Sequence, residues 1–377
     1  MFSARGGFNY VTLSAGGFPI YPAVATEAQL TTEMAKMGSA GNASSSNFTS
    51  DMSNTNGSFG VVSMPNDKIF ITDYGDGKHW ILDPTDDSMS SVASGAGTID
   101  LTECTLGLDG NVWIGGRNTR DLYWYNFTSG SVGTVTNVFP STYYVNSMET
   151  LPDGNIMCVP SGVSGTDLTI FSFNPSTGTA TDMGQDISVT NAQVYATLAL
   201  NGDVYLPPLS GANTHVLKYD YSADSWSSIN VSGVGWAGGV TAPNGKLYFA
   251  PSAAETILVI DPSDDSTSTI GSFATGGTSK FRRGHLGADG RIYFAKYQNT
   301  VNEWCVVDPS VDSSTKDPGY LSALPSGFGR GQGYAANNNS DIIYAFNWDT
   351  LSQVVKIDTN ANTAIDSNFW TSPQIND

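Results

Sequence analysis

The sequence has few basic residues. Its 377 residues include 16 Lys and Arg against 35 Asp and Glu, which gives a formal net charge of −19. A surface this acidic repels phosphate backbones, so we expect no binding to nucleic acid. No apolar run approaches the roughly 20 residues that a membrane-spanning helix needs. We therefore also expect no membrane insertion.

Histidine and cysteine are scarce as well, and the common catalytic motifs are missing. The sequence has no G-x-S-x-G nucleophile turn, no H-E-x-x-H zinc motif and no phosphate-binding glycine loop. Its three cysteines, Cys104, Cys158 and Cys305, are odd in number and form no C-x-x-C pair, so we expect buried free thiols. Residues 1–7 lead into polar sequence, unlike a signal peptide. A protein outside the cell would therefore need another export route.

What the sequence has in abundance is tight turns. Seven times, a turn built on Asp, Asn or Gly runs into a short apolar strand, as at 109–114 and 244–249. The second turn residues are Asp67, Gly110, Gly154, Gly202, Gly245, Gly290 and Ser340, a spacing of 43 to 50 residues. A period in the forties, with Asn-Gly and Asp-Gly turns, is typical of a β-propeller. We predict an all-β, seven-bladed β-propeller of four-stranded antiparallel blades over residues 58–377.

The other strands of each repeat fit this prediction. A strand ends in an Asp-Pro-like corner, as at Asp83 and Asp261, and we interpret these aspartates as turn residues. Ser- and Thr-rich strands follow, as at 88–92 and 266–270, and suit the outer edge of a blade. The inner strand should precede each turn. Seven residues upstream of the turns lie Gly60, Glu103, Ser147, Tyr195, Gly238, Arg283 and Gly333.

The first 57 residues do not share the repeat. They divide into a Gly-rich extended piece at 6–21, a short amphipathic helix expected at 26–37 and a Ser/Asn/Gly-rich linker at 38–57. One such helix cannot fold alone, so this N-terminal arm must dock on something. Either it packs on the propeller and completes a blade, or it anchors the propeller to another subunit. The candidate anchoring residues are Phe8, Tyr10, Phe18, Tyr21, Leu30 and Met34.

A cluster of charged residues on the inner strands is the candidate binding site. Arg282, Arg283 and His285 share one predicted inner strand, and two others carry Glu103 and Glu149. These side chains can meet at the mouth of the channel. Alternatively, Arg283 and a glutamate form an ion pair that sets blade packing, or Glu103, Glu149 and His285 bind a metal.

No cofactor is expected. Residues 73–77 resemble a fragment of a Ca²⁺ loop but lack its further acidic ligands, so we interpret them as a solvated turn, with a structural Ca²⁺ as the weaker alternative.

Two turn-and-strand segments resemble a known family. Asp-Gly-Asn-Val-Trp-Ile at 109–114, followed by Tyr-Asn-Phe-Thr-Ser-Gly at 125–130, resembles the blades of virginiamycin B lyase-like and NHL-type propellers. Residues 243–248 and 260–262 are similar to propellers found in microbes and viruses. The resemblance covers about residues 58–370 and implies the fold. The lyases use histidines and glutamates on inner strands and loops. Only His285 stands on an inner strand here, so no catalytic residue carries over.

These observations predict a non-enzymatic structural or recognition propeller. We expect a virion component of a phage capsid or tail, anchored to other protein subunits by residues 1–57, which presents its loops to a host surface protein or glycan. The alternative is a metal-dependent lyase- or lactonase-like enzyme with its site at the channel mouth. A third hypothesis is an extracellular glycan-binding propeller that uses exposed aromatics, for which the candidates are Trp113, Trp124, Trp226, Trp236 and Trp304.

Overall fold

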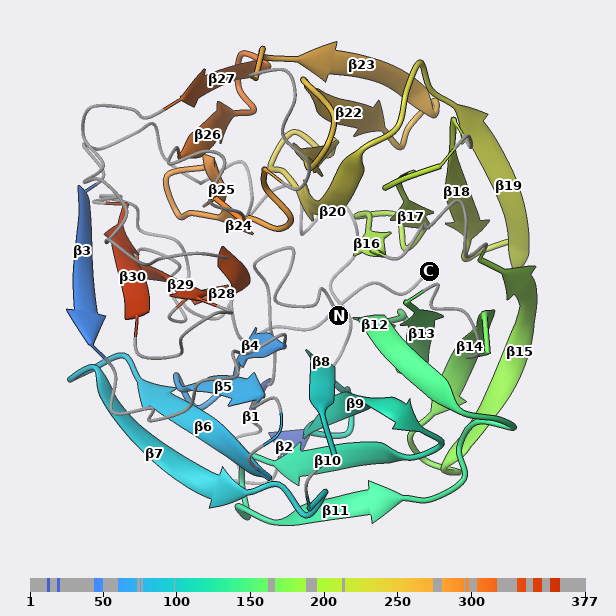
Figure 1. The fold of residues 1–377 in the computed structure, drawn as a ribbon, viewed down its shortest axis with the longest axis vertical. Helices are drawn as coiled ribbons and strands as arrows, with labels where there is room; N and C mark the ends of the chain where they lie inside the picture. Colours follow the sequence, from blue (N-terminus) through green and yellow to red (C-terminus); the bar gives the residue numbers. More distant parts are fainter. Residues whose placement is uncertain are drawn as a thin grey trace.

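The computed structural model has its strands arranged in a ring of blades around a central axis (Figure 1). It describes residues 12–13, 19–20, 44–49, 60–72, 75, 77–97, 99–161, 167–187, 195–211, 214–273, 280–294, 296–297, 304–316, 331–336, 342–347 and 353–359. Within these ranges the secondary structure is entirely β, with no helix. None of the described segments forms an apolar helix of membrane-spanning length. The helix expected at 26–37 and the anchoring residues Phe8, Tyr10, Phe18, Tyr21, Leu30 and Met34 lie outside the described residues.

The strands form seven sets of four, which run in chain order from the axis outward in blades 1 to 6. Blade 1 contains β4 (Val61–Ser63), β5 (Ile69–Thr72), β6 (Lys78–Asp83) and β7 (Ser88–Ala93). Blade 2 contains β8 (Leu101–Leu106), β9 (Asn111–Thr119), β10 (Leu122–Asn126) and β11 (Val132–Val135). Blade 3 contains β12 (Tyr143–Thr150), β13 (Ile156–Pro160), β14 (Thr169–Asn174) and β15 (Thr179–Asp186). Blade 4 contains β16 (Thr197–Leu198), β17 (Val204–Leu206), β18 (His215–Asp220) and β19 (Ser225–Asn230).

The remaining blades repeat the pattern. Blade 5 contains β20 (Trp236–Thr241), β21 (Leu247–Pro251), β22 (Ile257–Asp261) and β23 (Ser266–Ile270). Blade 6 contains β24 (His285–Leu286), β25 (Ile292–Phe294), β26 (Cys305–Asp308) and β27 (Ser313–Lys316). Blade 7 contains β28 (Gly331–Ala336), β29 (Ile342–Asn347), β30 (Gln353–Asp358) and, as its outer strand, β3 (Ser44–Thr49). A separate pair consists of β1 (Thr12–Leu13) and β2 (Pro19–Ile20). The β-propeller predicted from the turn repeat is confirmed.

The ring closes through strand β3. It pairs antiparallel with β30 over six residues, from Ser44 opposite Asp358 to Thr49 opposite Gln353. The last blade is therefore built from both ends of the described chain (Figure 1). The linker predicted at 38–57 was wrong for residues 44–49, which form a strand. Of the two roles considered for the N-terminal arm, these six residues complete a blade.

The predicted turns have the backbone that their residue types favour. Gly110, Gly154, Gly202, Gly245 and Gly290 all have positive φ, between 79° and 89°. Blade 1 has Asp67 at the equivalent place, with φ 64°. Asp and Asn tolerate this left-handed region better than other residues with a side chain. This explains why Asp67 can replace Gly in blade 1.

Three aspartates in outer corners clamp neighbouring blades together. Each accepts hydrogen bonds from a tyrosine hydroxyl and a lysine ammonium of the preceding blade. The three clamps are Tyr205 and Lys218 with Asp265, Tyr248 and Lys246 with Asp312, and Tyr344 and Lys356 with Asp87. All three aspartates have positive φ, between 48° and 58°. The corner aspartates thus have a second role that their turn chemistry did not predict.

Replacing Asp87 with asparagine tests the clamp that spans ring closure. Asn keeps the positive φ but loses the charge that Lys356 Nζ, 2.9 Å away, contacts. We expect a loss of about 1 kcal/mol in the free energy of unfolding, measured by urea titration. Asp86→Asn, in the same corner but outside the clamp, is the control. Equal stability of the two variants would contradict the clamp.

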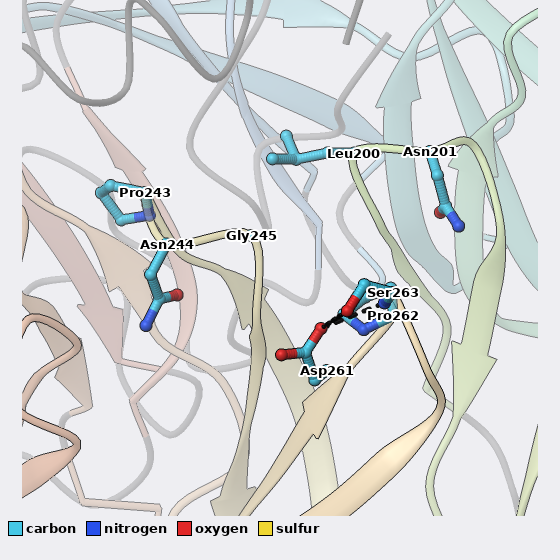
Figure 2. Close-up of a pocket in the computed structure, with 8 residues that line it drawn as sticks. All are labelled: Leu200, Asn201, Pro243, Asn244, Gly245, Asp261, Pro262 and Ser263. Atoms are coloured by element: carbon cyan, nitrogen blue, oxygen red, sulfur yellow. Dashed lines mark hydrogen bonds between the residues drawn. The ribbon is translucent and has the colours of Figure 1, made fainter. Parts of the chain in front are cut away.

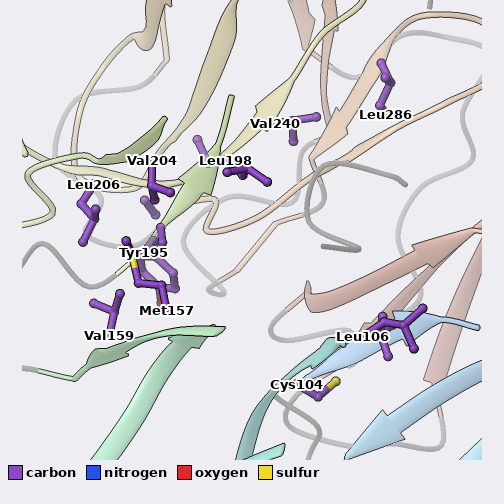
Figure 3. Packing of buried hydrophobic residues seen from close by; sticks show 14 of the residues in the cluster. Cys104, Leu106, Met157, Val159, Tyr195, Leu198, Val204, Leu206, Val240 and Leu286 are labelled. Atoms are coloured by element: carbon purple, nitrogen blue, oxygen red, sulfur yellow. The ribbon is translucent and has the colours of Figure 1, made fainter. Parts of the chain in front are cut away.

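The core lies between blades. Figure 3 shows Met157 and Val159 of β13 close to Val204 and Leu206 of β17, and all four are fully buried. Each such side chain contributes about 1.5–3 kcal/mol of hydrophobic free energy. The three cysteines are buried and free, as predicted, and burial raises the pKa of the Cys158 thiol.

Candidate functional site

The strands that surround the axis are β4, β8, β12, β16, β20, β24 and β28, the inner strands of the seven blades (Figure 1). Buried hydroxyl groups join them. Thr102 Oγ1 donates to Val145 O at 2.7 Å, Thr241 Oγ1 to Leu198 O at 2.6 Å and Thr150 Oγ1 to Leu106 O at 3.0 Å. Each bond links two neighbouring blades. The polar residues of these strands thus stabilise the ring.

Side chains of different size alternate around the axis. The position seven residues before each turn carries Glu103, Tyr195 and Arg283 in blades 2, 4 and 6, and glycine in blades 1, 5 and 7. Two of these glycines leave little room for a side chain. A Cβ atom at Gly60 would lie 2.6 Å from the backbone nitrogen of Cys104, and one at Gly238 would lie 3.1 Å from Arg282 O. The large side chains of blades 2, 4 and 6 therefore occupy the space beside the axis that the glycines of blades 1, 5 and 7 leave open.

Arg283 of blade 6 reaches across the ring to Glu103 of blade 2. The guanidinium Nη2 forms an ion pair with Glu103 Oε1, and the two residues are 5% and 1% exposed. The guanidinium also lies 5.2 Å from the centre of the Tyr195 ring in blade 4. Such a buried pair costs desolvation energy that its partners must offset. The ion pair considered in the sequence analysis is present, and it connects three non-adjacent blades.

Arg282 lies one residue earlier, at the end of the ring where the inner strands begin. Its Nη1 donates to Tyr195 Oη at 3.1 Å, and its guanidinium lies 4.0 Å from the centre of the Tyr297 ring. Burial lowers its pKa, but the nearby oxygens of Tyr195, Tyr297 and Tyr144 raise it by more, so Arg282 stays a cation. Arg117 stacks on Tyr144, 5.2 Å from the ring centre. We call Arg117, Tyr144, Tyr195, Arg282 and Tyr297 the mouth cluster.

The extension of β9 brings Arg117 to this place. Beyond its pairing in blade 2, β9 continues and pairs with the inner strand of blade 3, with Tyr144 opposite Arg117. Gly115 allows the approach, since a Cβ atom there would lie 2.4 Å from Val145 Cβ. Blades 2 and 3 consequently form one eight-stranded sheet.

The metal ligands of the enzyme hypothesis do not come together. Glu103 binds Arg283, and His285 Nδ1 lies 2.8 Å from the carbonyl oxygen of Leu286. Glu149 is 1% exposed on β12. No three His, Cys, Asp or Glu side chains in the described part of the chain are placed to hold a metal ion. The hypothesis that Glu103, Glu149 and His285 form such a site was therefore wrong. Residues 73, 74 and 76 of the Ca²⁺-loop-like segment lie outside the described residues.

Two histidines are buried in their neutral form, which predicts sensitivity to acid. Burial lowers the pKa of His79 to about 3 and that of His285 to about 4, from 6.5. Below pH 6.5 the unfolded chain binds protons that the folded chain does not. Stability is therefore fully present above pH 6.5 and falls as the pH drops towards 4, by up to about 1.4 kcal/mol per pH unit for each histidine.

The variant His79→Leu checks this expectation. His79 packs against Phe70, with ring centres 4.7 Å apart, so leucine suits the site. Urea unfolding between pH 6.5 and 4 should show a shallower loss of stability than in the parent chain, by about 1.4 kcal/mol per pH unit. An identical pH dependence in both proteins would contradict the prediction.

A pocket lies on the opposite end of the ring, among the turns of blades 4 and 5. Its volume is about 370 Å³, and Figure 2 shows Leu200, Pro243 and Pro262 around it. The polar groups here are used in turns: Asp261 accepts hydrogen bonds from the backbone and hydroxyl of Ser263, and Asn244 accepts one from Lys246 N. The pocket presents no ionisable pair for chemistry among its described lining residues.

The tryptophans suggested for glycan binding are largely core residues. Trp113, Trp236 and Trp304 are at most 3% exposed, so their expected exposure was wrong. The Trp113 indole donates to Asp109 at 3.1 Å, and Trp236 donates to Thr256 O at 2.7 Å. Trp124 and Trp226 are half-buried.

Comparison with known proteins agrees with the geometry. No protein-family model matches the sequence, and no curated protein does. Among solved structures, virginiamycin B lyase from Staphylococcus aureus aligns with a TM-score of 0.68 and 12% identity over 84% of this chain and 99% of the lyase. The chain is a β-propeller. A streptogramin B lyase aligns with a TM-score of 0.65 and 12% identity over 84% of this chain and 97% of the other, and Kuenenia stuttgartiensis hydrazine synthase with 0.62 and 10% over 82% and 97%. These similarities establish the propeller fold alone.

Proposed function

We propose that this propeller is a non-enzymatic recognition protein. The observation that carries the proposal is the Arg283–Glu103 ion pair. Because Arg283 pairs with Glu103 and lies beside Tyr195, these charged residues hold blades 2, 4 and 6 together. The mouth cluster, with its half-buried Arg282 and exposed Arg117, then remains as the polar surface of the channel that a partner can reach.

We further propose that the chain works in a virion, in a capsid or tail, anchored by its N-terminal arm. The acidic surface, with 16 basic against 35 acidic residues, suits a protein held at high local concentration. Residues 44–49 belong to blade 7, so the anchor hypothesis now concerns the residues before Ser44.

Particles purified from the source of this chain test the virion role. An antibody to the propeller should detect the full chain in the particle fraction after density-gradient sedimentation. A chain lacking residues 1–42 keeps β3 and should fold but stay out of the particles. Absence of the full chain from particles would contradict the virion role, and incorporation of the truncated chain would contradict the anchor.

A separate experiment tests the non-enzymatic part of the proposal. One of the similar solved structures contains a virginiamycin B lyase with quinupristin. Incubation of this chain with quinupristin and added divalent cations should leave the compound unchanged in reversed-phase chromatography. Conversion of quinupristin to a new product would contradict the proposal.

A further inference from the structure

Positive charge is concentrated in one blade of this acidic protein. Five of the 16 Lys and Arg residues lie between residues 280 and 296. Arg283 is neutralised by Glu103, and Arg291 lies 3.9 Å from Asp308. Lys280 Nζ donates to the carbonyl oxygens of Ala253 and Ala254. Arg282 lies at the mouth of the channel, and its contacts differ from those of Arg283, Arg291 and Lys280.

Arg282 has no carboxylate partner in the described part of the chain. Its contacts are the hydroxyl of Tyr195 and the ring of Tyr297, and its buried Nε has no hydrogen-bond partner. Neither contact is a carboxylate, so the two tyrosines orient the guanidinium without supplying a counter-ion. A cation taken partly out of water without a counter-ion is costly unless an anion completes the site.

The two tyrosines hold Arg282 in one position. Tyr195 and Tyr297 are 1% and 5% exposed, and they contact the guanidinium at its edge and on its face. Such a fixed guanidinium binds a carboxylate with two parallel hydrogen bonds at little entropic cost. Tyr195 and Tyr297 are therefore positioning residues for an anion site.

The least buried part of the mouth cluster is Arg117 together with the ring of Tyr144. Tyr144 is half-buried near the start of the inner strand β12, and Arg282 lies just before the inner strand β24, so both lie at the end of the ring where the inner strands begin. Arg117 stacks on the Tyr144 ring and is itself exposed. An aromatic ring beside a fixed arginine suits a ligand with a flat, weakly polar face next to one negative group.

The charge of the whole protein limits how many negative groups the ligand carries. With a net charge of −19, the protein as a whole disfavours polyanions such as nucleic acids and heavily sulfated chains. A single carboxylate on a sugar ring meets both requirements. We propose that the mouth cluster binds a terminal acidic sugar, a pyranose with one carboxylate, with the carboxylate on Arg282 and the ring on Tyr144. This inference rests on the proposed recognition function and names its ligand.

Isothermal titration calorimetry with the full chain tests the site. The probes are methyl β-D-glucuronide and the methyl glycoside of N-acetylneuraminic acid, with methyl β-D-glucoside as the neutral match and acetate as the carboxylate without a sugar. At least one acidic glycoside should bind, and roughly tenfold more tightly than the glucoside and acetate, because only it engages both groups.

Variants locate the binding. Arg282→Gln and Tyr144→Ala should each weaken binding by about tenfold or more. Arg291→Gln, at the turn end of blade 6, should bind as the parent does, and melting curves confirm that all variants are folded. The inference is overturned if neither acidic glycoside binds, if glucoside or acetate binds equally well, or if folded Arg282→Gln binds like Arg291→Gln. If the calorimetry shows no such binding but the full chain still enters particles and the truncated chain does not, the recognition function holds and its ligand is a different one.

Discussion

Replacing Arg283 with methionine is expected to lower the free energy of unfolding by about 3–5 kcal/mol. Glu103 is 1% exposed, and its carboxyl group would be left in the interior without the guanidinium that now contacts it. Methionine has a similar length and no charge, so it fills the space beside Tyr195 but cannot pair. Urea unfolding followed by tryptophan fluorescence measures the loss.

Arg291→Met is the matched control for this variant. Arg291 lies in the same blade but is partly exposed, and its nearest carboxylate is 3.9 Å away. Exposed pairs of this kind contribute about 0–1 kcal/mol. If Arg283→Met is no less stable than Arg291→Met, the axial pair does not stabilise the ring.

Removing strand β3 should have the second large effect. A chain that begins at residue 51 loses the six-residue pairing with β30 and leaves the last blade with an open edge. With a net contribution of about 0.5–1.5 kcal/mol for each hydrogen bond, we expect a loss on the order of 3 kcal/mol or more. An open strand edge also favours association, so the truncated chain should form oligomers in analytical ultracentrifugation.

A chain that begins at residue 43 is the control for this deletion. It lacks most of the arm but keeps all of β3. We expect it to unfold at nearly the same urea concentration as the full chain. Equal stability of the chains beginning at 43 and 51 would show that β3 does not close the ring.

The repeat made the fold predictable because its signal is local. Each blade has its own turn. The positive φ of a turn residue such as Gly202, which is 89°, can be predicted from the sequence alone. Strand β3 has no such signal, because Ser44–Thr49 becomes a strand only through pairing with a segment about 300 residues away. Its one sequence clue was a Ser-rich composition like that of the outer strands β7 and β23.

The candidate site was only half predictable for the same reason. Counting back from the turns placed Glu103, Tyr195 and Arg283 at one level of the ring, and the structure pairs two of them. Which side chains meet across the axis depends on how the blades are arranged around it. Arg117 and Tyr144 could not be found in this way, because β9 runs past its blade only in the folded ring.

The clamps at the outer corners show the limit of local interpretation. Asp265 and Asp312 lie in turns with positive φ, yet each also binds a lysine and a tyrosine of the preceding blade. Burial raises the pKa of Tyr205 and Tyr248, and the bonded aspartates raise it further. Both hydroxyls therefore stay protonated and donate to the carboxylates.

The double variant Glu103→Leu/Arg283→Met tests most directly whether the axial charges serve the scaffold. Replacing a buried ion pair with apolar side chains of similar size is often neutral or stabilising, whereas removing one partner is not. We expect the double variant to have a free energy of unfolding close to that of the parent chain and above that of Arg283→Met. If the losses of the two single variants simply add, Glu103 and Arg283 act independently and the account of the axis is wrong.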